Sequence, residues 1–342
     1  MVKTFVLSEN SKTDLYNLFI NIDSNPYQDY MAFKEEINQL IILSSNSFNE
    51  IKSILKTIQE ERNNKISYAH LIKNLPVDVN IPKFETSASV EEKYLLKKSF
   101  VGESVLEMAS FFTETPILAY DTRTNGDFFH DVYPIDKYKG TQTQKTDGEL
   151  FFHNDRTAHP IRADYLYLLG MTKNDKNNIY TGYIDGRNIL KFLTEEEQML
   201  LREAYFYTPY DEYSKDSNKN QINSAYHAIL IDEHSFRYYD TRTTYVPDAP
   251  VKYIKALLSL KNALTKSEKE YVKITKGDLF LFANLQSLHS KQLIQVNDIE
   301  EASHRWLLKT YNFKSINQLN NFSQYFHKDI PGLVKDSLVE PS

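Results

Sequence analysis

The 342-residue sequence contains no cysteine. This absence excludes disulfide bonds, thiolate metal sites and a cysteine nucleophile, so any bound metal must be held by histidine and carboxylate side chains. No run approaches the roughly 18 consecutive apolar residues of a membrane-spanning helix, and the N-terminus lacks the basic-then-apolar pattern of a signal peptide. We therefore expect a soluble, cytoplasmic protein with no membrane partner.

A surplus of basic residues is also absent. The formal net charge is −6 and no cluster of lysine or arginine stands out, so nucleic acid is not expected as a partner. Hydrophobic residues make up 41% of the chain and charged residues 25%, which is ordinary for a globular protein. A chain of this length can form one large domain, and we expect residues 1–342 to do so.

Residues 1–114 are predicted to be mostly helical, because their apolar residues recur at helical spacing. Residues 72–88 contain prolines and little periodicity, and they are predicted to be a connector. A longer helix is expected from about residue 90 to residue 112. The apolar stripes that carry the first three helices are Leu15, Leu18 and Phe19; Phe33, Ile37, Leu40 and Ile41; and Phe48, Ile51, Ile54, Leu55 and Ile58.

Residues 115–313 are predicted to form the core of the fold from ten short β-like segments, interrupted by helices at 195–206 and 249–263. This pattern favours a mainly β protein with helices (α+β), in which a double-stranded β-helix, or jelly roll, is flanked by helices. Residues 208–223 are polar and long for a loop, so they form either a mobile lid or a disordered surface segment. Residues 314–342 are expected to be a C-terminal tail. The ten segments are 117–121, 127–135, 149–153, 164–171, 178–185, 226–233, 235–240, 270–275, 278–283 and 304–313.

His153 and Asp155 flank a single residue after a short apolar segment. Side chains two apart in a strand point to the same face, so this imidazole and this carboxylate can converge on one ion. Together with a distant histidine they would form the 2-His-1-carboxylate triad of non-haem Fe(II) oxygenases. The tripeptide alone is common, and a surface histidine beside a solvated aspartate is the alternative interpretation.

Three further segments accompany this motif. Residues 126–134 read Gly-Asp-Phe-Phe-His-Asp-Val-Tyr-Pro, residues 277–284 read Gly-Asp-Leu-Phe-Leu-Phe-Ala-Asn and precede His289, and residues 305–311 read Arg-Trp-Leu-Leu-Lys-Thr-Tyr. With these phrases the chain resembles the Fe(II)/2-oxoglutarate-dependent oxygenases of the clavaminate synthase-like group, which includes hydroxylases of free amino acids. The resemblance covers roughly residues 100–313.

The resemblance implies a set of cofactor and cosubstrate residues. His153, Asp155 and His289 would bind Fe(II), leaving positions for 2-oxoglutarate and O2. Arg305 would bind the distal carboxylate of 2-oxoglutarate through two parallel hydrogen bonds, and Thr181 would add a hydroxyl donor. The group often has Glu where this chain has Asp155, and the shorter side chain puts a direct contact with the substrate amine in doubt.

The stretch after the metal motif most resembles free L-lysine hydroxylases, particularly those that act at C4. Related arginine hydroxylases place two carboxylates against the guanidinium, whereas this chain has Asp240 and then Arg242, which suits an ammonium better. Lys309 lies where relatives place an arginine for the substrate carboxylate, and Thr122 lies near a position that contacts the α-amine.

Two alternatives to a lysine hydroxylase remain open. One keeps the chemistry and changes the substrate to arginine, ornithine, another amino acid, or a carrier-bound or peptidyl residue. The other is a non-catalytic jelly-roll protein whose histidines and aspartate are structural.

The helical first third could also supply the surface of a homodimer.

Overall fold

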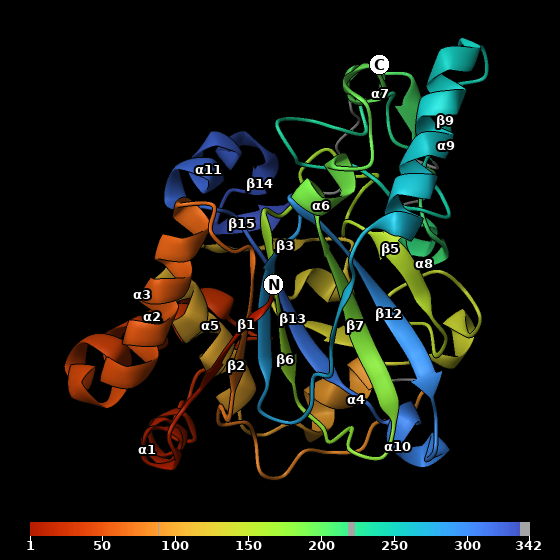
Figure 1. Ribbon diagram of the computed structural model, residues 1–342. Helices are drawn as coiled ribbons and strands as arrows, with labels where there is room; N and C mark the ends of the chain where they lie inside the picture. Colours follow the sequence, from red (N-terminus) through yellow and green to blue (C-terminus); the bar gives the residue numbers. More distant parts are fainter. Residues whose placement is uncertain (88, 218–222, 336–342) are drawn as a thin grey trace.

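The computed structural model describes residues 1–87, 89–217 and 223–335. Two β-sheets lie at its centre, with helices outside them (Figure 1). Among the described residues, no helix combines the length and the apolarity needed to cross a membrane.

The larger sheet collects strands from the whole length of the chain. In spatial order these are β1 (Lys3–Val6), β2 (Ala69–Lys73), β11 (Leu279–Ala283), β6 (Tyr165–Gly170), β13 (Leu307–Asn312), β3 (Ile117–Tyr120), β15 (Ile330–Val334) and β14 (Phe326–His327), and β4 (His130–Val132) also pairs with β13.

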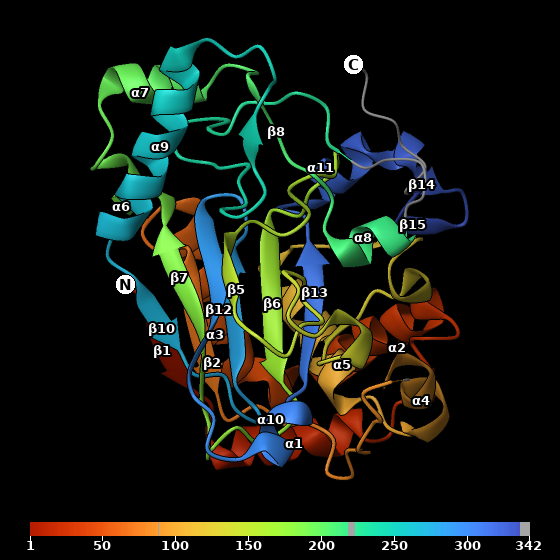
Figure 2. The ribbon, with the colours of Figure 1, turned by 90° about the vertical axis from the view of Figure 1, so that its right-hand side faces the viewer.

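The smaller sheet has the order β10 (Glu270–Val272), β7 (Asn178–Asp185), β12 (Ser287–Gln295) and β5 (Leu150–His153). Figure 2 shows β7, β12 and β5 side by side, with α6 (Gly186–Leu190), α7 (Glu195–Leu201) and α9 (Val251–Lys266) beyond one end of these strands. The short pair β8 (Phe206–Tyr207) and β9 (Thr244–Tyr245) lies at the same end.

Side chains alternate across the larger sheet with the period of two that a strand imposes. On β6, Tyr167 and Leu169 face the core that contains the N-terminal helices, whereas Leu166 and Leu168 face the core shared with the smaller sheet. Phe280 and Phe282 of β11 join Tyr183 of β7 in this second core. The two sheets are therefore packed face to face, and the predicted double-stranded β-helix is confirmed.

Four helices cover the outer face of the larger sheet: α1 (Glu9–Phe19), α2 (Tyr30–Leu43), α3 (Asn49–Asn63) and α5 (Val101–Thr113). The predicted apolar stripes are the buried faces of the first three, for example Phe33, Ile37 and Ile41 of α2. The first third also contributes β1 and β2 to the sheet, which the sequence analysis did not expect. Strand β2 occupies part of the predicted helical region and the start of the predicted connector.

The predicted helix over 90–112 is wrong in one respect, because it is two helices, α4 (Ser89–Leu96) and α5. The break is stabilised by Asp78, whose carboxylate accepts hydrogen bonds from the backbone N–H groups of Val101 (3.3 Å) and Gly102 (3.2 Å) at the start of α5. Lys97 forms buried ion pairs with Asp78 and with Glu103 at 3.0 and 2.9 Å. Because the residue that caps α5 lies far earlier in the chain, the local sequence does not predict the break between the two helices.

Two other predicted segments differ from the structure. Residues 226–233 and 235–240 form only isolated bridges, such as Leu230 with Phe236 and His153 with Tyr239. The predicted tail is folded over its described part, because α11 (Ile316–Asn321) is followed by β14 and β15, and β15 pairs in parallel with β3. Residues 336–342 lie outside the described residues.

The predicted lid over 208–223 contains a helix, α8 (Glu212–Ser217). Residues 218–222 lie outside the described residues. The remaining short elements are α10 (Ile299–Ser303) and the 3-10 turns η1 (Ser45–Phe48), η2 (Thr124–Gly126), η3 (Asp136–Tyr138) and η4 (Ser323–Tyr325).

The end of β6 tests the packing of the larger sheet. A Cβ atom on Gly170 would lie 2.0 Å from the backbone oxygen of Thr275, whereas one on Gly102 would lie 2.6 Å from the flexible end of Met171. We expect Gly170→Ala to lower the free energy of unfolding by at least about 1–3 kcal/mol, because the backbone of Thr275 would have to shift to accommodate the new methyl group. Gly102→Ala should cost clearly less in the same urea titration, and equal losses would contradict this reading of the packing.

Candidate metal centre and adjoining cavities

His153 and His289 lie opposite each other on neighbouring strands. His153 is the last residue of β5, and it pairs in antiparallel register with His289 of β12. Their ring centroids are 4.2 Å apart. Asp155 follows just beyond the end of β5, where its backbone N–H donates to the side-chain oxygen of Asn284 at 2.8 Å. The sheet therefore fixes both imidazoles, and Asn284 fixes the backbone of the carboxylate.

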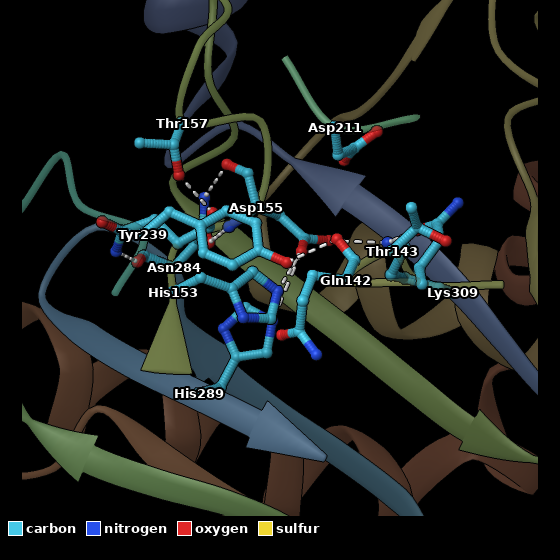
Figure 3. Close-up of polar contacts among 12 residues, drawn as sticks. Gln142, Thr143, His153, Asp155, Thr157, Asp211, Tyr239, Asn284, His289 and Lys309 are labelled. Carbon is cyan, nitrogen blue, oxygen red and sulfur yellow. Dashed lines mark hydrogen bonds and ion pairs between the residues drawn. The ribbon is translucent and has the colours of Figure 1, made fainter. Parts of the chain in front are cut away.

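The three side chains converge on one point (Figure 3). Asp155 Oδ1 lies 3.2 Å from His153 Nε2 and 3.4 Å from His289 Nε2. One ligand atom from each residue lies within 4.8 Å of the other two, and all three residues are buried. This is the only such group of three among the residues that the structure describes.

The protonation states of this group fit a divalent cation. The Nδ1 atom of His153 is 2.7 Å from the Phe151 carbonyl, so Nδ1 donates to that oxygen and Nε2 faces the centre. Burial lowers the pKa of His289 to about 4, which keeps this imidazole neutral. Two imidazoles and one carboxylate are the ligand set of a 2-His-1-carboxylate metal site.

Lys309 makes an ion pair with the other oxygen of the candidate ligand carboxylate. Its Nζ atom, on β13, lies 2.6 Å from Asp155 Oδ2 and 2.9 Å from the hydroxyl of Tyr311, and it also donates to the side-chain oxygen of Gln144. Burial alone would raise the pKa of Asp155, but the ammonium of Lys309, together with the hydrogen bonds to His153 and His289, outweighs burial and holds the pKa well below its usual range. Oδ1 is thus left for a metal.

An inner cavity joins the triad to Arg305 and Thr181. All five side chains line it, with Val132, Leu168 and Leu307 forming apolar walls. Arg305 lies between α10 and β13 rather than on the predicted strand, and it is buried. Burial lowers its pKa to about 10, which still leaves it cationic.

Arg305 is a buried cation with no carboxylate partner among the described residues. Its Nε atom has no hydrogen-bond partner there, and none of the ion pairs in that part of the chain includes it. A buried charge without a partner is costly, so the cavity is built for an anion.

A second cavity, named the substrate-side cavity for the role proposed below, also borders the metal group. Its lining includes His153 and Asp155, the basic residues Arg123 and Arg156, and Asp211. Asp211 directly precedes α8, and its Oδ1 lies 3.9 Å from a terminal nitrogen of Arg123. Asp211 is not among the predicted substrate residues, because it lies in a polar stretch with no local pattern that distinguishes it from the other acidic residues there.

Three predicted substrate residues lie elsewhere, and none lines either cavity in the described part of the chain. The carboxylate of Asp240 accepts from the Tyr238 hydroxyl at 2.6 Å and pairs with Lys261 of α9 at 3.1 Å. Arg242 holds the start of α8, donating to Glu212 at 2.5 Å. Thr122 is close in sequence to Arg123, which does line the substrate-side cavity, but it does not line that cavity itself.

The solved structures that this fold resembles include non-haem iron oxygenases. An asparagine oxygenase in complex with Fe(II), 2S,3S-3-hydroxyasparagine and succinate is 17% identical, with a TM-score of 0.78 over 97% of this chain and 99% of that one. The non-heme iron oxygenase OrfP with Fe, succinate and (3R,4R)-dihydroxy-L-Arg is 16% identical, with a TM-score of 0.78 over 97% and 100%. OrfP with Fe and alpha-ketoglutaric acid is 16% identical, with a TM-score of 0.77 over 98% and 100%.

No family model matches the sequence, and no curated protein does either. The structural likeness at this low identity establishes the fold of the chain.

Lys309→Met tests the ion pair at the metal group. The ammonium lowers the pKa of Asp155, so its removal raises that pKa and lets protons compete with the metal at higher pH. We expect the pH at which Mn(II) binding is half lost, measured by calorimetry, to rise in this variant.

Lys261→Met is the matched control, because it removes an ammonium from Asp240, which lines neither cavity. Its Mn(II) binding should follow the wild-type pH profile. Identical profiles for the two variants would contradict a role for Lys309 at the metal group.

Proposed function

We propose that this protein is an Fe(II)/2-oxoglutarate-dependent hydroxylase of free L-lysine, acting at C4 and yielding hydroxylysine, succinate and CO2. The observation that carries the proposal is one buried cavity that holds both a 2-His-1-carboxylate group and an arginine without an anion. The 2-His-1-carboxylate group is suited to Fe(II), and the arginine is suited to the distal carboxylate of a dicarboxylic keto acid.

Each residue has a distinct task in this proposal. His153, Asp155 and His289 hold Fe(II), and Arg305 with Thr181 holds the distal carboxylate of 2-oxoglutarate. When bound, the iron and the keto acid supply the O2-dependent oxidation of an unactivated C–H bond. The protein's own part is to orient one carbon of the amino acid toward the metal and to keep water out.

The substrate-side cavity suits an amino acid with a cationic tail. Asp155 is engaged by Lys309 and by the metal, so Asp211 is the remaining described carboxylate in the lining. One carboxylate suits an ammonium better than a guanidinium, which favours lysine. Arg123 and Arg156 line the same cavity and provide cationic groups for the α-carboxylate.

The comparisons support an amino acid as the class of substrate. The asparagine oxygenase structure contains a hydroxylated asparagine, and OrfP structures contain hydroxylated arginines. Arginine is therefore the second candidate, with ornithine next to it by charge. A non-catalytic metal-binding protein would have no use for Arg305, a buried cation beside the metal group.

The first test is succinate formation from 2-oxoglutarate by the Fe(II)-loaded protein in air, across a panel of free amino acids. We expect L-lysine to stimulate it most, above arginine, ornithine and asparagine. Mass spectrometry and NMR of the product should place one new hydroxyl at C4. Stimulation by arginine alone would move the assignment to the second candidate, and no stimulation by any free amino acid would contradict the proposal.

Asp211→Asn tests the anion that we assign to the substrate. Loss of a charge-assisted hydrogen bond of about 1.4 kcal/mol corresponds to about a tenfold change in affinity. We expect KM for L-lysine to rise about tenfold, with KM for 2-oxoglutarate unchanged.

Asp240→Asn is the matched control, because Asp240 pairs with Lys261 outside the cavity. It should leave KM for L-lysine near the wild-type value. A larger rise in Asp240→Asn than in Asp211→Asn would reverse the assignment of the two carboxylates.

A further inference from the structure

Lys291 is a second basic residue in the inner cavity. It follows His289 by two positions on β12, so both side chains point to the same face of the sheet. It pairs directly with Thr181 of β7 in antiparallel register. The cavity lining contains Lys291, Thr181 and Arg305 together.

The ammonium of Lys291 donates only to backbone carbonyls among the described residues, those of Thr146 at 3.0 Å and Asp147 at 3.3 Å. Its third N–H is available for a further acceptor. The carboxylate of Asp147 accepts instead from the backbone N–H of Gly140 at 3.1 Å. Lys291 and Arg305 are thus two cations in one cavity, neither with a carboxylate partner in that part of the chain.

The two basic side chains share this one buried cavity. Two like charges that share a buried space raise the energy of the empty cavity, and an anion with two acceptor oxygens relieves both.

We propose that Lys291 binds the distal carboxylate of 2-oxoglutarate together with Arg305, and so makes the site selective for keto acids that end in a carboxylate. The inference rests on the proposed function and adds a residue to it. Arg305 and Lys291 each engage the carboxylate, Thr181 donates its hydroxyl, and Val132, Leu168 and Leu307 contact the methylene chain.

The test compares two keto acids that differ only at the far end. 2-Oxovalerate has the carbon chain of 2-oxoglutarate but ends in a methyl group. Each is titrated anaerobically into the Fe(II)-loaded protein without amino acid, and the dissociation constant is read from the absorbance change. We expect Lys291→Met to weaken 2-oxoglutarate binding about tenfold or more. The same variant should bind 2-oxovalerate within about twofold of the wild type. Lys291→Arg should restore part of the lost affinity for 2-oxoglutarate.

Lys269→Met is the matched control. The ammonium of Lys269 also donates only to backbone carbonyls among the described residues, those of Leu264, Thr265 and Ser267 at 2.7, 3.1 and 3.0 Å, but it lines neither cavity. Its binding of both keto acids should match the wild type. If Lys291→Met weakens both keto acids equally, or neither, the residue only holds the 146–147 backbone and the inference is overturned.

Arg305→Met separates this inference from the proposed function. Suppose that the wild type binds 2-oxoglutarate, that Arg305→Met abolishes this binding, and that Lys291→Met leaves it unchanged. The proposed role of Lys291 is then wrong, while the proposed function stands. If the Fe(II)-loaded wild type binds 2-oxoglutarate no better than 2-oxovalerate, the proposed function fails as well.

Discussion

The candidate metal site depends on one buried carboxylate that contacts two imidazoles on one side and an ammonium on the other. Asp155 faces two imidazoles through Oδ1 and the ammonium of Lys309 through Oδ2. Without the lysine, the pKa of this buried carboxyl would be higher, and a protonated acid is a poor metal ligand. With it, the carboxylate stays ionised in a place from which water is largely excluded. Lys309 belongs to the larger sheet and His289 to the smaller one, so the metal group also joins the two sheets.

The face-to-face sheets set the distances on which this arrangement depends. β5 and β12 fix the two histidines by register, and β13 supplies Lys309 and, just before its first residue, Arg305. The metal group therefore borders two cavities, one lined by the basic groups Arg305 and Lys291 and the other by Arg123, Arg156 and Asp211. In the proposed function, the keto acid occupies the first of these cavities and the amino acid the second. This separation is the structural basis for assigning different residues to each.

Periodicity and motif spacing predicted much of the fold and the metal group. The stripes of the first helices and the strands β3, β6, β7 and β11 follow from local pattern, and the group around His153 follows from a resemblance carried by several segments together. Strand β12 was missed because its sequence is largely polar, Ser-Leu-His-Ser-Lys-Gln, since one of its faces lines a cavity. Strand β2 and the break before α5 depend on partners far away in the chain, such as Asp78.

The substrate residues were the least predictable from sequence. Asp240 and Lys309 were predicted from the resemblance to a family, whereas their partners in the structure come from distant parts of the chain. Asp240 pairs with Lys261, and Lys309 pairs with Asp155. Asp211 acquires its place only when the chain before α8 folds over the cavity, and no local pattern encodes that contact.

The central claim is that three side chains bind one ferrous ion while Arg305 anchors a keto acid beside it. Its most direct test is anomalous X-ray diffraction from crystals grown anaerobically with Fe(II) and 2-oxoglutarate. The account predicts one iron peak bounded by Nε2 of His153, Nε2 of His289 and Oδ1 of Asp155, with the distal carboxylate of the keto acid on Arg305. An iron peak elsewhere, or a keto acid that leaves Arg305 without a partner, would contradict it.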